Sequence, residues 1–216
     1  MSGITLAFAG GSFAPSVPTV IGQAFGGGYY AGQIGVSSVA TYYIIVGPAA
    51  SAESSGKQWK NAQTATTGAD SVIDGPQNTA DMVADGNSTV YPAAHYCNDL
   101  VVGGFSDWYL PAQNELEICY YNLKPTTTSN NTSSGINANA VPARASNYSA
   151  GNPAQTSVAD FQGPSGAERF GISQSYWSST EGSATGGRYI FFQTGYQRTY
   201  NKEVANRVRA VRRIPV

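Results

Sequence analysis

The chain has 216 residues, which is enough for one sizeable hydrophobic core and for a single large domain with an appendage. Only 12% of the residues are charged and the formal net charge is −1, so neutral polar side chains must cover most of the surface and no general positive field exists. We therefore expect neither a nucleic-acid partner nor insertion into a membrane, since no stretch reaches the roughly 20 apolar residues of a membrane span.

Residues 1–28 are rich in Gly, Ala, Ser and Pro and have no helical period. Alone, this segment could not bury enough apolar surface to offset the entropy lost on ordering. It is either a disordered leader or an attachment arm that orders against a neighbouring subunit, and its scattered apolar residues favour the arm. Residues 1–3 carry no positive charge, so a secretory signal peptide is not expected. The domain is then predicted to cover residues 29–216.

Residues 29–36 and 41–46 are rich in Tyr, Ile and Val and predict two strands of a hairpin that turns at Ser37 and Ser38. The Gly-Pro pair at residues 47–48 ends the second strand. Residues 49–90 have the composition of loops, with turn points such as Trp59 and one short helix predicted around residues 79–83.

Two amphipathic helices are predicted next. The first begins at Pro92 and ends at the glycines 103–104, and the second begins after Pro111 and ends at residues 124–125. Apolar residues recur on each at spacings of three and four: Ala93, Tyr96, Cys97 and Leu100, then Leu116, Cys119, Tyr120 and Leu123. Because both cysteines lie on these apolar faces, two unpaired buried thiols are favoured over a disulfide.

Residues 126–170 form a long polar stretch, which indicates an irregular loop region. Residues 175–179, 187–194, 197–202 and 207–214 predict closely spaced antiparallel strands. Two short helices followed by a β-meander indicate an α+β fold with a twisted antiparallel sheet and long irregular loops.

Three motifs occur in a fixed order: GFSDWYLP at residues 104–111, YWSST at 176–180 and RVRAVR at 207–212. Over about residues 29–216 they resemble the Lcl carboxy-terminal domain family of bacteria and their phages. The resemblance implies a C-type-lectin-like fold related to formylglycine-generating enzymes. We predict Trp108, Leu110, Leu116 and Trp177 as core residues. The family usually has a hydroxyl residue after Leu-Pro, where this chain has Ala112, so the helix cap must come from elsewhere.

Catalytic residues are hard to assemble from this sequence. His95, the single histidine, is interpreted as structural, and Ser178 and Ser179 lack the turn of a serine nucleophile. Helix-dipole and turn roles explain the acid pairs 81/85, 99/107 and 115/117. The cysteines that act in formylglycine-generating enzymes have no counterparts in the carboxy-terminal part of this chain. We therefore expect no catalytic residue and no enzyme activity.

Metal ligands are also not expected. No cysteine and histidine spacing fits zinc. A loose group of acidic and amide side chains could hold a structural calcium ion, although we favour turn roles for these residues. The group consists of Asp70, Asp74, Asp81, Asp85 and Asn87. Hence no cofactor is predicted.

Contact residues are predicted among the late strands and loops. Tyr196, Arg198 and Tyr200 alternate along one strand and can share an exposed face, and Tyr148 lies in the long polar loop. Tyrosine and arginine are enriched at recognition surfaces. The remaining arginine cluster, residues 207–213, is interpreted as charge that protects an edge strand.

The neutral polar composition is typical of extracellular adhesins and virion fibres. Together with the resemblance, it predicts a non-enzymatic phage virion protein of the tail or tail fibre, with a role in host-surface recognition and adsorption. Residues 1–28 would contact other virion proteins, the loops would contact a host-surface glycan or protein, and the chain would form a homo-oligomer, a trimer if it is a fibre. The alternatives are a purely structural decoration or collar protein and a glycan-active enzyme.

Overall fold

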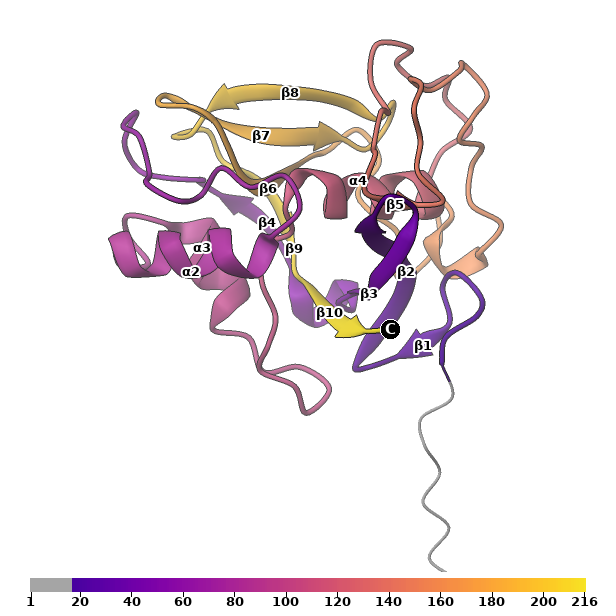
Figure 1. The fold of residues 1–216 in the computed structure, drawn as a ribbon, viewed down its shortest axis with the longest axis horizontal. Coiled ribbons are helices and arrows are strands. Elements are labelled where there is room, and N and C mark those ends of the chain that lie inside the picture. Colours follow the sequence, from indigo (N-terminus) through magenta and orange to yellow (C-terminus); the bar gives the residue numbers. More distant parts are fainter. Residues whose placement is uncertain (1–16) are drawn as a thin grey trace, which may run out of the picture.

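The structure, a computed structural model, describes residues 17–216. The described residues form two curled sheets and several short helices (Figure 1). The strands are β1 (Ala24–Phe25), β2 (Gly28–Val36), β3 (Val39–Val46), β4 (Glu53–Lys57), β5 (Ala140–Val141), β6 (Ser175–Ser183), β7 (Gly186–Phe191), β8 (Tyr196–Asn201), β9 (Asn206–Arg209) and β10 (Val211–Pro215). The helices are α1 (Ala49–Ala52), α2 (Gly75–Asp85), α3 (Pro92–Asn98) and α4 (Gln113–Leu123), with a 3-10 turn, η1, at Ala159–Phe161. The predicted α+β class is confirmed, while the C-type-lectin-like part of that prediction stays a prediction.

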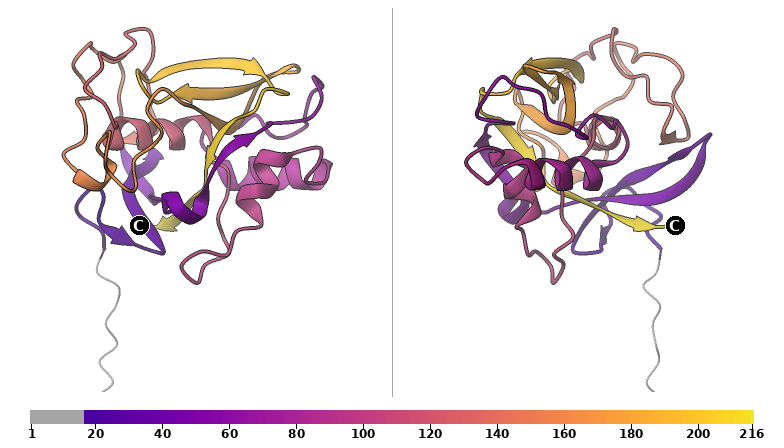
Figure 2. Two further views of the ribbon diagram at one scale, coloured as in Figure 1. Left: turned by 180° about the vertical axis from the view of Figure 1, so that it is seen from behind. Right: turned by 60° about the vertical axis from the view of Figure 1, so that its left-hand side comes forward.

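The first sheet has the order β1-β2-β3-β10, with β5 beside β2. Strands β2 and β3 form the predicted hairpin, whose turn residues Ser37 and Ser38 have positive φ angles of 51° and 63°. Two positive φ angles are typical of the primed two-residue turns that match the twist of a hairpin. Strand β10 pairs antiparallel with β3, so the end of the chain lies beside its first hairpin (Figure 2).

The second sheet has the order β4-β9-β6-β7-β8. Strands β6, β7 and β8 form the predicted antiparallel meander. The prediction is wrong for residues 207–214, which are predicted to form one antiparallel strand and instead form parts of β9 and β10. Strand β9 runs parallel to β6 and lies between β4 and β6, and β10 belongs to the other sheet. The run crosses between the sheets at Ala210, a buried residue whose backbone N–H donates to the carbonyl of Ala52.

The described helices are more numerous than the two amphipathic ones predicted. Helix α2 extends the short helix expected at residues 79–83, and Asp74 caps it by accepting from the N–H of Gln77. Helix α4 begins at a residue with no side-chain cap. Its first N–H, on Gln113, donates to Thr180 Oγ1 of β6 at 2.9 Å, and the Glu115 carboxylate accepts from the N–H of Ala112 at 2.8 Å. Thr180 of β6 and Glu115 of α4 itself therefore supply the missing cap.

The apolar interior consists of two clusters. Trp108, Leu110 and Trp177 are buried in one cluster and Leu116 in the other, as predicted for core residues. Trp59, which the sequence indicated only as a turn point, is fully buried with them, and its ring N–H donates to the carbonyl of Ser178 at 2.8 Å. Cys97 and Cys119 are buried in different clusters and are unpaired, as predicted.

The segment before β2 contacts the body at residues 21–25. Strand β1 pairs with β2, and the N–H of Gly22 donates to the carbonyl of Tyr30 at 2.8 Å. Ile21 packs against both apolar clusters. The later part of the predicted attachment arm is thus in contact with the domain, whereas residues 1–16 lie outside the described residues. No helix within residues 17–216 is both long and apolar enough to cross a membrane.

Candidate functional site

The predicted contact residues of β8 lie together on one face of the outermost strand of the second sheet (Figure 1). Tyr200 is 51% exposed, and Arg198 is also exposed. The guanidinium carbon of Arg198 lies 5.4 Å from the ring centre of Tyr196. Alternate residues of a strand share a face, so the row Tyr196-Arg198-Tyr200 combines two phenol rings with one cation.

The neighbouring strand adds Tyr189, which sequence reasoning missed. Tyr189 is directly opposite Arg198 in the β7–β8 register. Its ring lies edge-on to Tyr200, with centres 6.0 Å apart, and edge-on to buried Trp177, with centres 6.2 Å apart. Burial raises the pKa of Tyr189, so its hydroxyl remains a hydrogen-bond donor at neutral pH. The β7–β8 face, defined as Tyr189, Tyr196, Arg198 and Tyr200, is therefore anchored to the core at one side.

Tyr148 does not join this face. It is only 5% exposed, and its ring packs against Tyr120 with centres 5.5 Å apart. Its hydroxyl donates to Glu117 Oε1 at 2.6 Å. The long polar loop folds back on α4 here, because the buried carboxylate offers the tyrosine a strong acceptor. A surface contact by Tyr148 is thus inconsistent with where the structure places it.

Two carboxylates of α4 are fully buried. Glu117 accepts from Tyr148, accepts from Asn137 and pairs with Arg144. Glu115 accepts from the hydroxyl of Tyr109 at 2.8 Å and from the N–H of Ala112. Burial raises the pKa of Glu117 and raises that of Glu115 to about 7.

Raised carboxyl pKa values are a mark of catalytic acids, so these two residues are the natural candidates for chemistry. Each of their four oxygens, however, has a protein partner. The arrangement fixes the Tyr109 turn and the long loop onto α4. Of the predicted helix-dipole roles, only that of Glu115 fits, since it alone lies in the first turn.

The structure most clearly corrects the sequence interpretation at the arginines of β9. Arg209 is 1% exposed, donates from Nε to the carbonyl of Gly47 at 2.6 Å, and pairs with Glu53 at 3.0 Å and Glu168 at 3.1 Å. Arg207 also pairs with Glu53, at 2.7 Å. Because β9 lies between two strands, the predicted edge-protecting role is wrong for both residues.

The acidic loop group is divided among structural partners. Asp74 caps α2 and pairs with Arg213 at 3.1 Å. Asp85 accepts from the Tyr91 hydroxyl, and this hydrogen bond holds the pKa of Asp85 below its usual value. The His95 ring contacts the carbonyl of Gly86 at 2.8 Å, consistent with a structural histidine. Among residues 17–216, no three His, Cys, Asp or Glu side chains are grouped to hold a metal ion.

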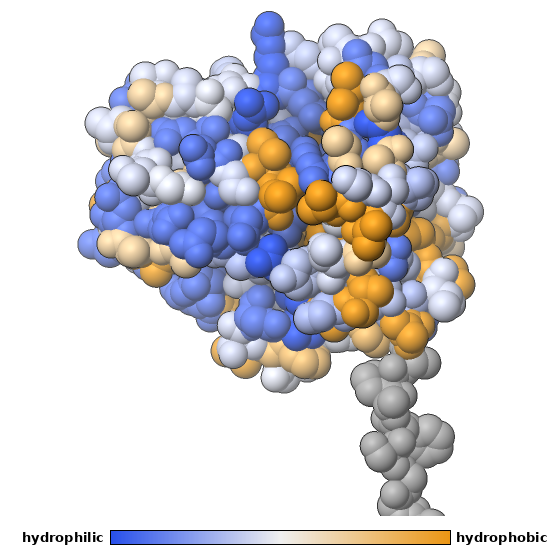
Figure 3. Space-filling model, in the orientation of Figure 1, coloured by the Kyte–Doolittle hydropathy of each residue, from blue (hydrophilic) through white to orange (hydrophobic). Residues whose placement is uncertain are grey.

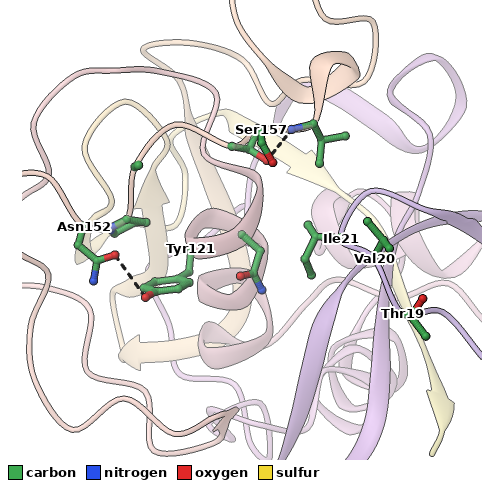
Figure 4. A pocket seen from close by; sticks show the side chains of 11 residues that line it. Thr19, Val20, Ile21, Tyr121, Asn152 and Ser157 are labelled. Atoms are coloured by element: carbon green, nitrogen blue, oxygen red, sulfur yellow. Dashed lines mark hydrogen bonds between the residues drawn. The ribbon is translucent and has the colours of Figure 1, made fainter.

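A groove of about 680 Å³ lies on a different part of the molecule (Figure 4). Three segments form it: residues 19–21 before β1, Tyr121 and Asn122 of α4, and residues 152–158 of the long loop. The Tyr121 hydroxyl donates to Asn152 Oδ1 at 3.4 Å across one end. We call this cavity the α4 groove. No local sequence pattern indicates it, because three segments that are separate in the sequence form its walls.

The sequence model of the Lcl C-terminal domain family matches residues 51–212. The matched range contains all three sequence motifs but begins after the β2–β3 hairpin. A comparison with curated proteins gave no match.

Proposed function

The chain belongs to the Lcl C-terminal domain family, and on that premise we propose that it is a non-enzymatic virion protein of a phage tail or tail fibre that contacts the host surface. The observation that carries the proposal is the exposed β7–β8 face on the outermost strand of the second sheet. Tyrosine supplies a large contact area and a hydrogen-bonding hydroxyl with few rotatable bonds to immobilise, and arginine adds charge and several hydrogen-bond donors.

The rest of the surface supports a recognition role. Blue and white residues cover most of the face seen in Figure 3, and orange apolar residues gather from its centre toward the lower right. With 12% charged residues, the cover is largely neutral hydroxyl and amide groups. Such a surface resists non-specific binding to charged polymers while it leaves one aromatic face available for contact.

Single contacts on so small a face would be weak. We propose that the chain forms a homo-oligomer, a trimer if it is a fibre, so that several copies bind one cell and avidity replaces a deep pocket. The part of residues 1–28 that does not pack on the domain would attach it to other virion proteins, and the virion would be its location. The recognised partner would be a glycan or protein of the host surface.

The hydrogen bonds made by the two buried glutamates support the proposed lack of catalysis. Glu115 and Glu117 have the raised pKa values that a general acid needs, but protein partners occupy all four of their oxygens. A glycan-active enzyme would release reducing sugar from host-surface polysaccharide and would lose that release when one of these residues is changed to Gln.

The test is competition for adsorption. Excess purified full-length protein should bind cells of the bacterial strain that the phage infects and should block infection. Binding to virions without binding to cells would instead support a purely structural role. Release of reducing sugar during the same incubation would contradict the non-enzymatic part of the proposal.

A further inference from the structure

We propose that the α4 groove is a binding site for a short neutral saccharide. None of the eleven residues that line it is charged. Hydroxyl and amide side chains (Thr19, Asn122, Asn152 and Ser157) alternate with apolar ones (Val20, Ile21, Pro153 and Val158). A neutral sugar has the matching chemistry, because hydroxyl groups lie around its rim and C–H groups form its faces.

The size of the groove suits an oligosaccharide. Its volume of about 680 Å³ falls within the roughly 300–1,000 Å³ that is usual for small-molecule sites. Asn152, Ala154 and Ser157 are exposed, so the groove opens to solvent along the loop wall. A chain of sugars could therefore enter lengthwise and continue beyond the site.

Two amide side chains of the groove have hydrogen bonds that orient them, a short one for Asn122 and a long, weaker one for Asn152. Asn122 donates from Nδ2 to the carbonyl of Ala31 at 2.7 Å, which orients its amide and leaves Oδ1 as an acceptor. Asn152 accepts through Oδ1 from the Tyr121 hydroxyl, so its Nδ2 is left as the donor group. Such preorganised donors and acceptors lower the entropic cost of binding.

The loop wall is also fastened to the body. Buried Lys124 donates from Nζ to the carbonyl of Pro153 at 3.2 Å, and Asn130 donates to the same carbonyl at 2.8 Å. The N–H of Thr156 donates to the carbonyl of Lys124 at 2.9 Å. Opposite, a side chain at Gly22 would collide with Val158, which shows how closely the amino-terminal wall approaches the loop.

Hydrogen bonds rather than ring stacking would carry the affinity. The guanidinium carbon of Arg144 lies 4.0 Å from the ring centre of Tyr121 and covers one of its faces. The apolar contacts to a sugar face would come instead from Val20, Ile21 and Val158. Figure 4 draws Val20 and Ile21 across the groove from the tyrosine.

This site is separate from the β7–β8 face, because none of its lining residues belongs to β7 or β8. It does not rest on the proposed function, since a free sugar in solution tests it without any host cell.

The experiment follows backbone amide shifts of the full-length protein by NMR during titration with neutral trisaccharides, maltotriose and triacetylchitotriose. Acidic sialyllactose is the charged comparison. We expect one neutral sugar to shift the amides of Tyr121, Asn152 and Ser157 with a millimolar or tighter Kd, about −4 kcal/mol or better.

Two test variants and one control variant locate the binding. Ala154→Trp fills the groove from an exposed position and should weaken binding at least about tenfold. Ala184→Trp, at an exposed position in the β6–β7 turn, adds the same side chain elsewhere and should leave the Kd unchanged. Asn152→Asp keeps the shape of the side chain but replaces the amide donor with a charge, and it should also weaken binding. The proposal is overturned if neither neutral sugar binds at about 10 mM, if Ala154→Trp binds as well as the natural chain, or if sialyllactose binds more tightly.

Discussion

Arg212 and Asp107 form a two-pronged ion pair, with Nε to Oδ1 and Nη2 to Oδ2 both at 2.8 Å, across 105 residues of sequence. The guanidinium carbon of Arg212 also lies 3.7 Å from the ring centre of Phe105. Next to the pair, Tyr109 and Val211 exchange backbone hydrogen bonds of 2.9 and 3.0 Å. The motif at residues 104–111 and the terminal Val-Arg motif are therefore two halves of one structural unit that closes the fold.

Arg212→Lys should destabilise the domain by about 1 to 2 kcal/mol, because an ammonium group cannot keep both prongs and the stack on Phe105. Urea unfolding monitored by tryptophan fluorescence measures the change. Arg213→Lys is the control. The Arg213 guanidinium carbon also lies over an aromatic ring, 4.4 Å from the centre of Tyr42, but its ion pair with the half-exposed Asp74 has a single prong, so this change should cost less. Equal costs for the two variants would contradict the role given to the Arg212–Asp107 pair.

Thr180→Val should also destabilise the protein. Thr180 Oγ1 accepts from the first N–H of α4 and donates to the carbonyl of Ser71 at 2.8 Å. Valine therefore leaves the buried N–H of Gln113 without a partner, while the Ser71 carbonyl keeps only its hydrogen bond from Asn78. We expect a loss of about 1 to 3 kcal/mol in the free energy of unfolding. Thr127→Val, at an exposed position, should change it little. A Thr180→Val protein as stable as the natural chain would mean that β6 does not cap α4.

Titration of Glu115 should make the stability of the protein depend on pH. Its pKa is about 7 in the folded protein against 4.5 for an ordinary glutamate, so the folded state holds this proton more tightly than the unfolded chain does. The contribution to stability is then complete below about pH 4.5 and is lost as the pH rises to about 7, by something on the order of 3 kcal/mol.

Glu115→Gln removes that loss, so the free energy of unfolding of the variant minus that of the natural chain should increase between about pH 4.5 and about pH 8. Urea unfolding at both pH values measures it, with the same substitution at exposed Glu203 as the control. A constant difference for Glu115→Gln would show that Glu115 titrates alike in both states.

Both thiols should be inert in the native protein. Cys97 and Cys119 are fully buried, and burial raises the pKa of each thiol, which lowers the fraction of reactive thiolate. A thiol reagent such as Ellman's should detect no thiol in the folded chain and two after unfolding in guanidinium. Detection of none after unfolding would indicate a disulfide instead.

Local pattern was sufficient to predict most elements of this fold. The turn at Ser37 and Ser38, the start of α3 at Pro92 and the end of α4 before Lys124-Pro125 all depend on short-range backbone preferences. The choice of strand partners does not depend on such short-range preferences. Pairing of β10 with β3 joins residues about 170 positions apart, and nothing near Val211 encodes that choice.

Burial of polar residues was the second limit. In the sequence, Arg209 looks like a surface arginine, but in the fold it pairs with Glu53 and Glu168. Tyr148 likewise looks like an exposed loop tyrosine, but its hydroxyl donates a hydrogen bond to Glu117. In each case the partner, not the residue itself, decides whether burial is favourable. Tyr196, Arg198 and Tyr200 could be predicted to share a face because strand alternation is local, whereas Tyr189 required the cross-strand register.

The most direct test of the account is the affinity of the full-length protein for host cells when single residues of the second sheet are changed. Arg198→Ala or Tyr200→Ala should weaken cell binding at least about tenfold, because both side chains belong to the exposed β7–β8 face. Arg188→Ala, an exposed arginine on the opposite side of the same sheet, should bind as the natural chain does. If all three variants bind cells equally well, or if the natural chain does not bind them, the recognition role assigned to this face is contradicted.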